Sequence, residues 1–263
     1  MSALESIINM TLFLYGILAS TLAGLGTGLG ALPVLFVREL SRKTLCILLG
    51  GSAGVMLAAT SFSLIIPGIA HGELLWPGHG VFVVMAGILF GGILLDVIDK
   101  KMPHEHFFKG PEGPSSRLRR IWLFVIAITI HNFPEGMAVG VGFGAGDTGA
   151  GTSLAMGIGL QNMPEGLAVA LPLLGLGYSR LKALGIATAT GLVEPIGGLL
   201  GAGAVTLFHP VLPLALAFAA GAMLFVISDE IIPETHSEGK SRPATYGVLV
   251  GFIIMMALDN LLG

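Results

Sequence analysis

Eight long apolar stretches limit how this chain can fold more than any other feature of its sequence. A helix needs about 20 mostly apolar residues to span the hydrocarbon core of a bilayer. Lipid offers no partners to unpaired backbone groups, so apolar segments of this length are predicted to be helices. The stretches lie near residues 8–36, 45–67, 79–98, 121–144, 151–176, 182–208, 211–233 and 244–262. We therefore predict an all-α, polytopic integral membrane protein with eight transmembrane helices, folded as a single transmembrane domain over residues 1–263.

The distribution of charge supports this interpretation and orients the chain. Charged residues make up 11% of the sequence, whereas soluble domains carry about 25%. All thirteen Lys and Arg residues lie in alternate gaps between the apolar stretches, near residues 38–43, 100–120, 180–182 and 240–242. The positive-inside rule places these gaps in the cytoplasm and both termini outside it. The longest gap, about 99–120, is predicted to be a cytoplasmic loop between the third and fourth helices.

Two similar hexapeptides interrupt the apolar stretches with polar side chains. They are HNFPEG at residues 131–136 and QNMPEG at residues 161–166. In each, His131 or Gln161 precedes a glutamate by four residues, so both side chains project from one helix face about 6 Å apart along the axis. A proline before each glutamate removes a backbone N–H and frees a carbonyl oxygen. A third intramembrane carboxylate, Glu194, precedes a proline on the sixth stretch.

The cost of burying these groups indicates a bound cation. Each ionised glutamate at the centre of a membrane helix costs roughly 2.5–3.5 kcal/mol on insertion scales. Glu135, Glu165 and Glu194 together would therefore cost about 9 kcal/mol, and no Lys or Arg lies nearby in these stretches. Carboxylates, an imidazole and amide oxygens suit zinc or another first-row divalent ion. The alternative is a network of protonated glutamates hydrogen-bonded across helices, because intramembrane acids also serve as proton relays.

With both hexapeptides and the Glu194-Pro195 pair, the sequence resembles the ZIP (Zrt-, Irt-like) family of divalent metal transporters, near its bacterial GufA-like branch. The resemblance implies import of Zn²⁺, or of Cd²⁺, Fe²⁺ or Mn²⁺, with no catalytic cofactor. It implies two adjacent metal sites midway through the membrane. The first would use Met56, His131, Glu135, Gln161 and Glu165; the second would use Asn132, Asn162 and Glu194, with Glu135 and Glu165 bridging. Many members have aspartate where Asn162 stands, so the second site here carries one negative charge fewer.

The resemblance also implies an elevator-like motion of one helix group past the other, and a multi-pass location in the bacterial inner membrane. The expected partners are divalent cations and the lipid bilayer. Formation of a homodimer stays open, and nothing in the sequence points to nucleic acid.

Other polar residues are candidates for the metal pathway. Ser63 lies seven residues after Met56 and thus on the same helix face, and Asp259 matches a family position near the external mouth. A cytoplasmic exit is one interpretation of the acidic end of the seventh stretch, and a solvated helix end is the other. That end comprises Asp229, Glu230, Glu234 and His236. His104 and His106 on the loop are candidates for capturing released metal.

Two other classes of protein use similar residues. An intramembrane metal-dependent hydrolase would activate water with the same carboxylates and imidazole, but the HExxH pattern is absent from the sequence. A metal-gated channel or sensor would bind the ion without carrying it. We expect a secondary or facilitated transporter rather than an enzyme.

Overall fold

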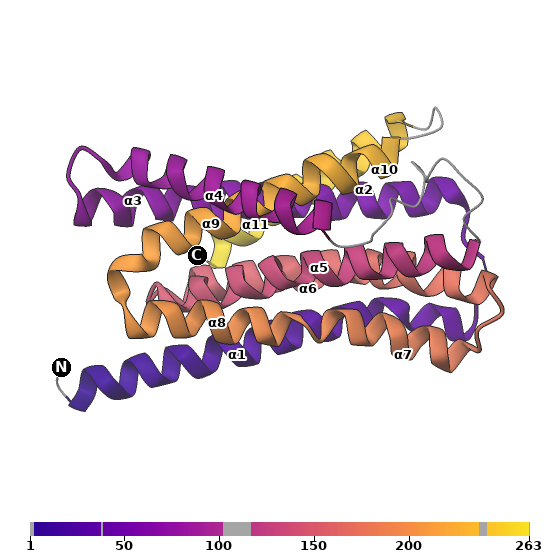
Figure 1. Ribbon diagram of the computed structural model, residues 1–263, viewed down its shortest axis with the longest axis horizontal. Helices are drawn as coiled ribbons and strands as arrows, with labels where there is room; N and C mark the ends of the chain where they lie inside the picture. Colours follow the sequence, from indigo (N-terminus) through magenta and orange to yellow (C-terminus); the bar gives the residue numbers. More distant parts are fainter. Residues whose placement is uncertain (1–2, 38, 102–116, 237–240, 263) are drawn as a thin grey trace.

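The computed structural model describes residues 3–37, 39–101, 117–236 and 241–262. All regular structure within these residues is helical, and none of it is strand. The longer helices run side by side along one axis of the molecule (Figure 1). The predicted all-α architecture is therefore confirmed for the described part of the chain.

The helices form two groups (Figure 1). The first group, which we call the motif group, carries the two hexapeptides and Glu194. It contains α1 (Ala3–Ala31), α5 (Arg117–Gly144), α6 (Thr148–Gly175), α7 (Arg180–Gly191) and α8 (Glu194–Leu207). The second, the flanking group, contains α2 (Arg42–Ala58), α3 (Ile66–Leu75), α4 (Gly80–Lys101), α9 (Leu212–Val226), α10 (Ile232–His236) and α11 (Ser241–Leu262).

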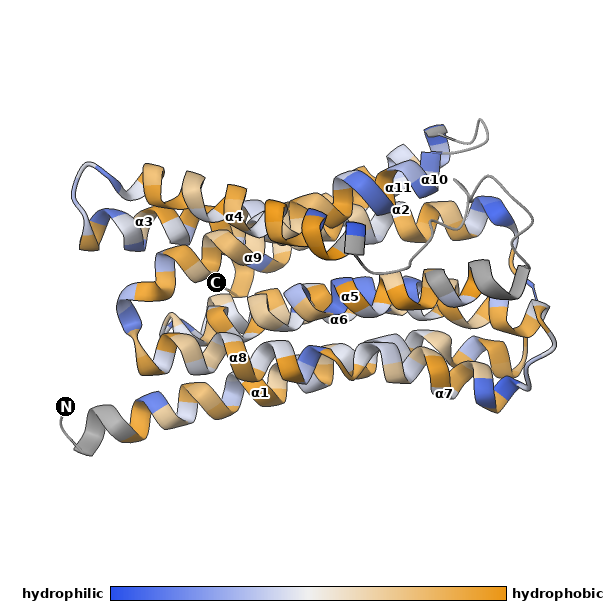
Figure 2. Cartoon of the chain, viewed as in Figure 1, coloured by the Kyte–Doolittle hydropathy of each residue, from blue (hydrophilic) through white to orange (hydrophobic). Residues whose placement is uncertain are grey.

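Seven helical stretches of the described residues are long and apolar enough to cross a membrane. They are Ile7–Leu35, Arg42–Leu75, Gly80–Ile98, Phe124–Gly144, Arg180–Leu207, His209–His236 and Arg242–Leu262. Hydrophobic residues cover most of their length, while hydrophilic ones gather near helix ends and near the middle of α5 and α6 (Figure 2). The chain is thus a multi-pass membrane protein.

The remaining predicted span, 151–176, coincides with α6. This helix has 28 residues and is therefore about 42 Å long, which is enough to cross a bilayer. It is not among the seven apolar stretches, and it carries the polar side chains of the second hexapeptide. The count of eight spans and the position of both termini outside the cytoplasm stay predictions.

Several spans are interrupted where polar residues cluster. Pro134 lies inside α5, and Pro164 lies inside α6. Between α7 and α8 the helix breaks, so that Glu194 begins α8. π-Helical turns, which are frequent at functional sites, occur at Ala59–Ile65 and Ile227–Ile231. Broken helices near the midplane are a recurrent feature of transporter binding sites.

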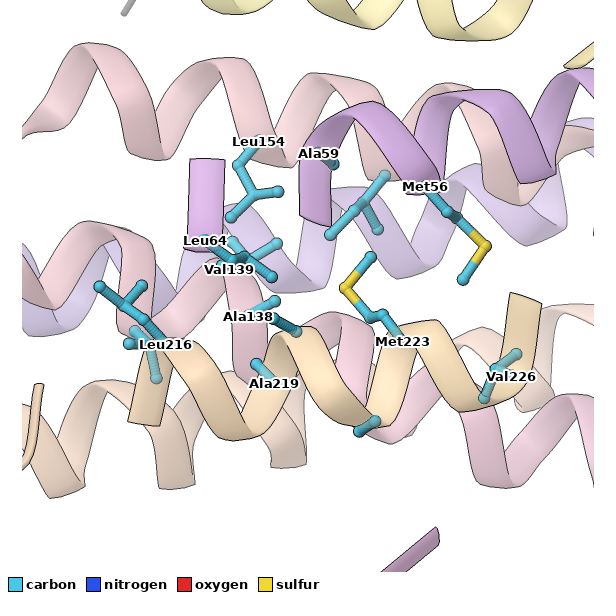
Figure 3. Close-up of a cluster of buried hydrophobic side chains, with 14 of the residues drawn as sticks. Met56, Ala59, Leu64, Ala138, Val139, Leu154, Leu216, Ala219, Met223 and Val226 are labelled. Carbon is cyan, nitrogen blue, oxygen red and sulfur yellow. The ribbon is translucent and has the colours of Figure 1, made fainter. Parts of the chain in front are cut away.

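Apolar side chains pack between the two helix groups. Met56 on α2 and Met223 on α9 point into the space between these helices, close to Ala138 and Val139 of α5 (Figure 3). All four side chains are fully buried. The contact between the two helix groups is therefore apolar around Met56 and Met223.

The glycine that ends each hexapeptide lets two helix backbones touch. A Cβ atom at Gly136 would overlap the carbonyl oxygen of Glu194 on α8, and one at Gly166 would overlap that of Thr27 on α1. Small residues commonly permit such close approach in membrane helices. These two contacts bring α5 against α8 and α6 against α1 at the level of the two hexapeptides.

We expect Gly166→Ala to destabilise the protein, because the obstructing atom at Thr27 is backbone and cannot turn aside. Overpacking of this kind costs about 1–3 kcal/mol. The thermal unfolding midpoint of the purified protein in detergent should fall accordingly. Gly185→Ala is the matched control, since a Cβ at Gly185 on α7 meets no atom within 4 Å. Equal midpoints for the two variants would contradict the close contact between α1 and α6.

Candidate metal centre

Three glutamates on three helices of the motif group form the core of the candidate metal centre. Glu135 comes from α5, Glu165 from α6 and Glu194 from the first turn of α8. Each is at most 1% exposed. Neighbouring side chains link them, since His131 of α5 lies 3.6 Å from Glu165 of α6 and Asn162 of α6 donates to Glu194 of α8. The structure thus brings together three carboxylates that lie up to 59 positions apart in the sequence.

His131 lies between two carboxylates from different helices. Its Nε2 is 3.6 Å from Oε2 of Glu165, and its Nδ1 is 3.1 Å from Oε2 of Glu230. Glu230 belongs to the π-helical turn after α9, which is part of the flanking group. The contact with His131 is a role for Glu230 that the sequence did not indicate.

The amide side chains link α6 to its neighbours. Asn162 Nδ2 donates to Glu194 Oε1 at 2.6 Å and to the backbone oxygen of Ala23 on α1 at 2.9 Å. Gln161 Nε2 donates to Asn162 Oδ1 at 2.9 Å. The backbone oxygen of Gln161 accepts from the hydroxyl of Ser52 on α2 at 2.5 Å. Ser52 was missed from the sequence, although it lies four residues before Met56 and thus on the same helix face.

Many polar atoms of this centre are buried without a hydrogen bond in the described structure. They include both carboxylate oxygens of Glu135 and of Glu165, Oε2 of Glu194, Oε1 of Gln161, Nε2 of His131 and both amide atoms of Asn132. Burying such an atom unpaired costs roughly 1–3 kcal/mol. Concentrated at one place, these atoms form a set of oxygen and nitrogen donors that a divalent cation would satisfy.

These side chains do not converge on one point in the structure. In the described residues, no group of three or more His, Cys, Asp or Glu side chains is positioned to hold a metal ion. Zinc ligands lie about 2.0–2.2 Å from the metal, so binding would require small rotations of these side chains. The assignment of individual ligands therefore stays a prediction.

Met56, a predicted ligand, lies in the apolar cluster between the helix groups. Its side chain is fully buried beside Ala59 and Met223 (Figure 3). This environment is that of a core residue, and a role in metal binding stays a prediction.

The predicted pathway residues fall at different places. Ser63 donates a hydrogen bond to Asp259 at 2.7 Å, which joins two residues proposed separately. Glu234 is buried and Asp229 half-buried, an environment unlike a fully solvated helix end. His236 contacts the hydroxyl of Thr245 at 3.1 Å. His104 and His106 lie outside the described residues.

These features together define a multi-pass membrane protein with a buried centre of carboxyl, amide and imidazole groups on broken helices. Residues 101–259 match the model of the ZIP zinc transporter family. The chain is 49% identical to the zinc transporter GufA of Myxococcus xanthus over 255 residues, which cover 94% of this chain and 99% of that relative. The chain belongs to the ZIP family.

Two further relatives agree with this assignment. The zinc transporter ZIPB of Bordetella bronchiseptica is 45% identical over 95% of this chain and 82% of its own length. The zinc transporter ZupT of Akkermansia muciniphila is 37% identical over 90% of this chain and 94% of its own length. The resemblance found in the motifs is thereby confirmed over nearly the whole chain. These relatives are transporters, in agreement with the expectation that this chain is not an enzyme.

Proposed function

We propose that this protein carries zinc-like divalent cations into the cytoplasm through a two-metal site built on α5, α6 and α8. The observation that carries the proposal is the concentration of buried polar atoms without hydrogen bonds on these helices. A cation that fits this centre would offset both the repulsion among the carboxylates and the loss of their hydration. The relatives, which are named as zinc transporters, support the choice of ion.

The two metal positions differ in their donors. His131, Gln161 and Met56 would complete the first, with Glu135 and Glu165 shared between both. Asn132, Asn162 and Glu194 would complete the second. Imidazole and thioether donors favour softer ions such as Zn²⁺ and Cd²⁺, whereas carboxylate and amide oxygens bind harder ions as well. The first position would therefore account for most of the preference for zinc-like metals.

Glu230 offers the first carboxylate ligand for a metal ion that leaves this centre. It lies against His131 and belongs to the same short segment as Asp229 and Glu234, which the sequence predicts near the cytoplasmic face. A metal leaving His131 would meet Glu230 next. We propose that this segment begins the exit route.

Movement of the motif group against the flanking group would expose the centre to each side in turn. The apolar cluster around Met56 and Met223 supports this proposal, because apolar surfaces can slide without breaking hydrogen bonds. The bond between Ser52 and the Gln161 carbonyl crosses the same boundary and would have to break or move with the step.

Import requires the predicted orientation, which cysteine labelling tests. We expect Thr148→Cys, exposed at the start of α6, to react with an impermeant maleimide in intact cells. Lys182→Cys, exposed near the start of α7, should react only after permeabilisation. The one native cysteine, Cys46, is buried and can be replaced by serine in both variants. The reverse labelling pattern would make the protein an exporter or overturn the topology.

Transport itself is tested in proteoliposomes that contain the purified protein and a zinc-sensitive dye. We expect uptake that saturates with zinc concentration and that Cd²⁺ inhibits by competition. Flux that rises linearly with concentration would indicate a channel, and binding without flux would indicate a sensor. Repeating the assay with an imposed pH gradient would show whether protons are coupled.

A further inference from the structure

A groove lies between α2, α6 and α11, and Gln161 is the one proposed metal ligand among the described residues that line it. Its volume is about 620 Å³. Its apolar walls include Ile47 and Val55 of α2, Leu160 of α6, and Val250 and Ile254 of α11. We refer to it as the α2/α11 groove.

Two basic residues mark one end of the α2/α11 groove. Lys43 and Arg242 both line it and are both exposed, and the described residues that line it include no Asp or Glu. Lys43 is the second residue of α2, and Arg242 is the second residue of α11. The positive charge of the groove therefore lies where these two helices begin.

The close packing of α2 and α11 shows that the two charges lie at the same end of the groove. A Cβ at Gly50 would overlap the carbonyl oxygen of Ala244, and a Cβ at Gly54 would overlap that of Val248. Four residues along α2 thus correspond to four residues along α11 in the same direction. The helices are parallel, so Lys43 and Arg242 share one end of the groove.

The length of the groove matches one leaflet of a membrane. From Lys43 to Val55 along α2, or from Arg242 to Ile254 along α11, a rise of about 1.5 Å per residue gives about 18 Å. Half of a hydrocarbon core about 30 Å thick is about 15 Å. With its basic end at the headgroup level, a groove of this length would reach the middle of the bilayer. Gln161 and Pro164 of α6 also form part of its wall.

We propose that the α2/α11 groove binds one anionic phospholipid of the cytoplasmic leaflet. Lys43 and Arg242 would hold the phosphate and the acidic headgroup, since basic pockets between membrane helices bind such lipids. An acyl chain would lie against Ile47, Val250 and Ile254. Tyr246, which is 68% exposed in the same lining, would lie beside the glycerol region, as aromatic residues do at membrane interfaces.

A second groove of the same volume provides a comparison within the molecule. It lies between α1, α6 and α7, is also about 620 Å³, and has no charged residue among the described residues that line it. Any lipid there would be held by its acyl chains alone and would show no preference for headgroup charge. The two basic residues at one end of the α2/α11 groove thus distinguish it from a surface that only contacts lipid tails.

Native mass spectrometry of the purified protein, titrated with phosphatidylglycerol or phosphatidylcholine of identical acyl chains, tests the proposal. We expect a preference for phosphatidylglycerol that Lys43→Gln and Arg242→Gln each reduce by about fivefold, the effect of one basic residue near a lipid surface. Lys182→Gln, which removes an exposed charge outside both grooves, should leave the preference unchanged.

A second variant tests the groove without changing charge. Gly51 lines the groove, and a Cβ there meets only the oxygen of Gly247, at 3.9 Å, so Gly51→Leu adds bulk to the groove from a position where a Cβ is tolerated. We expect it to lose bound phosphatidylglycerol while keeping its elution volume in size-exclusion chromatography.

Equal binding of the two lipids, or wild-type preference in Lys43→Gln and Arg242→Gln, would overturn the proposal. So would displacement of the lipid by glycerol phosphate, which would indicate a site for soluble anions. None of these outcomes depends on whether the protein carries metal.

Discussion

Glu165→Gln should reduce zinc uptake in proteoliposomes to the level of protein-free vesicles. The substitution keeps the size and shape of the side chain but removes a charge that both proposed metal positions share. An interaction with a charged group in a buried site is worth roughly 1.5–3 kcal/mol, and two cations would lose it at once. A loss of at least about 100-fold follows from about 3 kcal/mol.

Asp96→Asn is the matched control for this variant. This substitution also removes one negative charge, but Asp96 lies near the end of α4 in a surface ion pair with Lys100. Such pairs contribute little to the stability of a protein. Asp96→Asn should transport like the wild type. If Glu165→Gln still binds and carries zinc normally, the two-metal interpretation is wrong, whatever family the motifs belong to.

His131→Ala should change the choice of metal as well as the rate. The imidazole is the one nitrogen donor in the proposed centre, and it lies between Glu165 and Glu230. Its removal leaves the Met56 thioether as the one soft ligand among oxygen donors, and oxygen donors suit harder ions such as Mn²⁺. Zinc uptake should fall by about 10- to 100-fold, the usual effect of disturbing a metal site, while Mn²⁺ uptake should fall less.

The control for His131→Ala is His209→Ala, which removes an exposed imidazole between α8 and α9. Competition of Zn²⁺ and Mn²⁺ for uptake of a radioactive tracer measures the relative preference directly. A parallel loss for both metals would assign His131 to folding or gating instead of selection.

The sequence was sufficient to predict the class of fold and the polar residues of α5, α6 and α8. Apolar stretches of about 20 residues have few alternatives to the helix in lipid, and glutamates among them stand out because they are costly there. Hydropathy does not support every span equally. The polar motif and small residues of α6 make it less apolar than the other seven, although its 28 residues are sufficient to cross a bilayer.

Contacts between distant side chains could not be predicted in the same way. His131 and Glu230 are 99 positions apart, and Ser63 and Asp259 are 196 apart. In each pair one partner belongs to a π-helical turn, where the extra residue changes which side chains share a face. A helical repeat of 3.6 residues therefore does not give the direction of these side chains, and the packing of the helices against one another decides it.

The most direct test of the central claim is an anomalous difference map at the zinc absorption edge, from crystals of the protein soaked in zinc. We expect density between Glu135 and Glu165, with a first peak toward His131 and Gln161 and a second toward Glu194 and Asn162. The first peak should disappear in His131→Ala. A map with zinc only at the surface, and none among these three glutamates, would contradict the account.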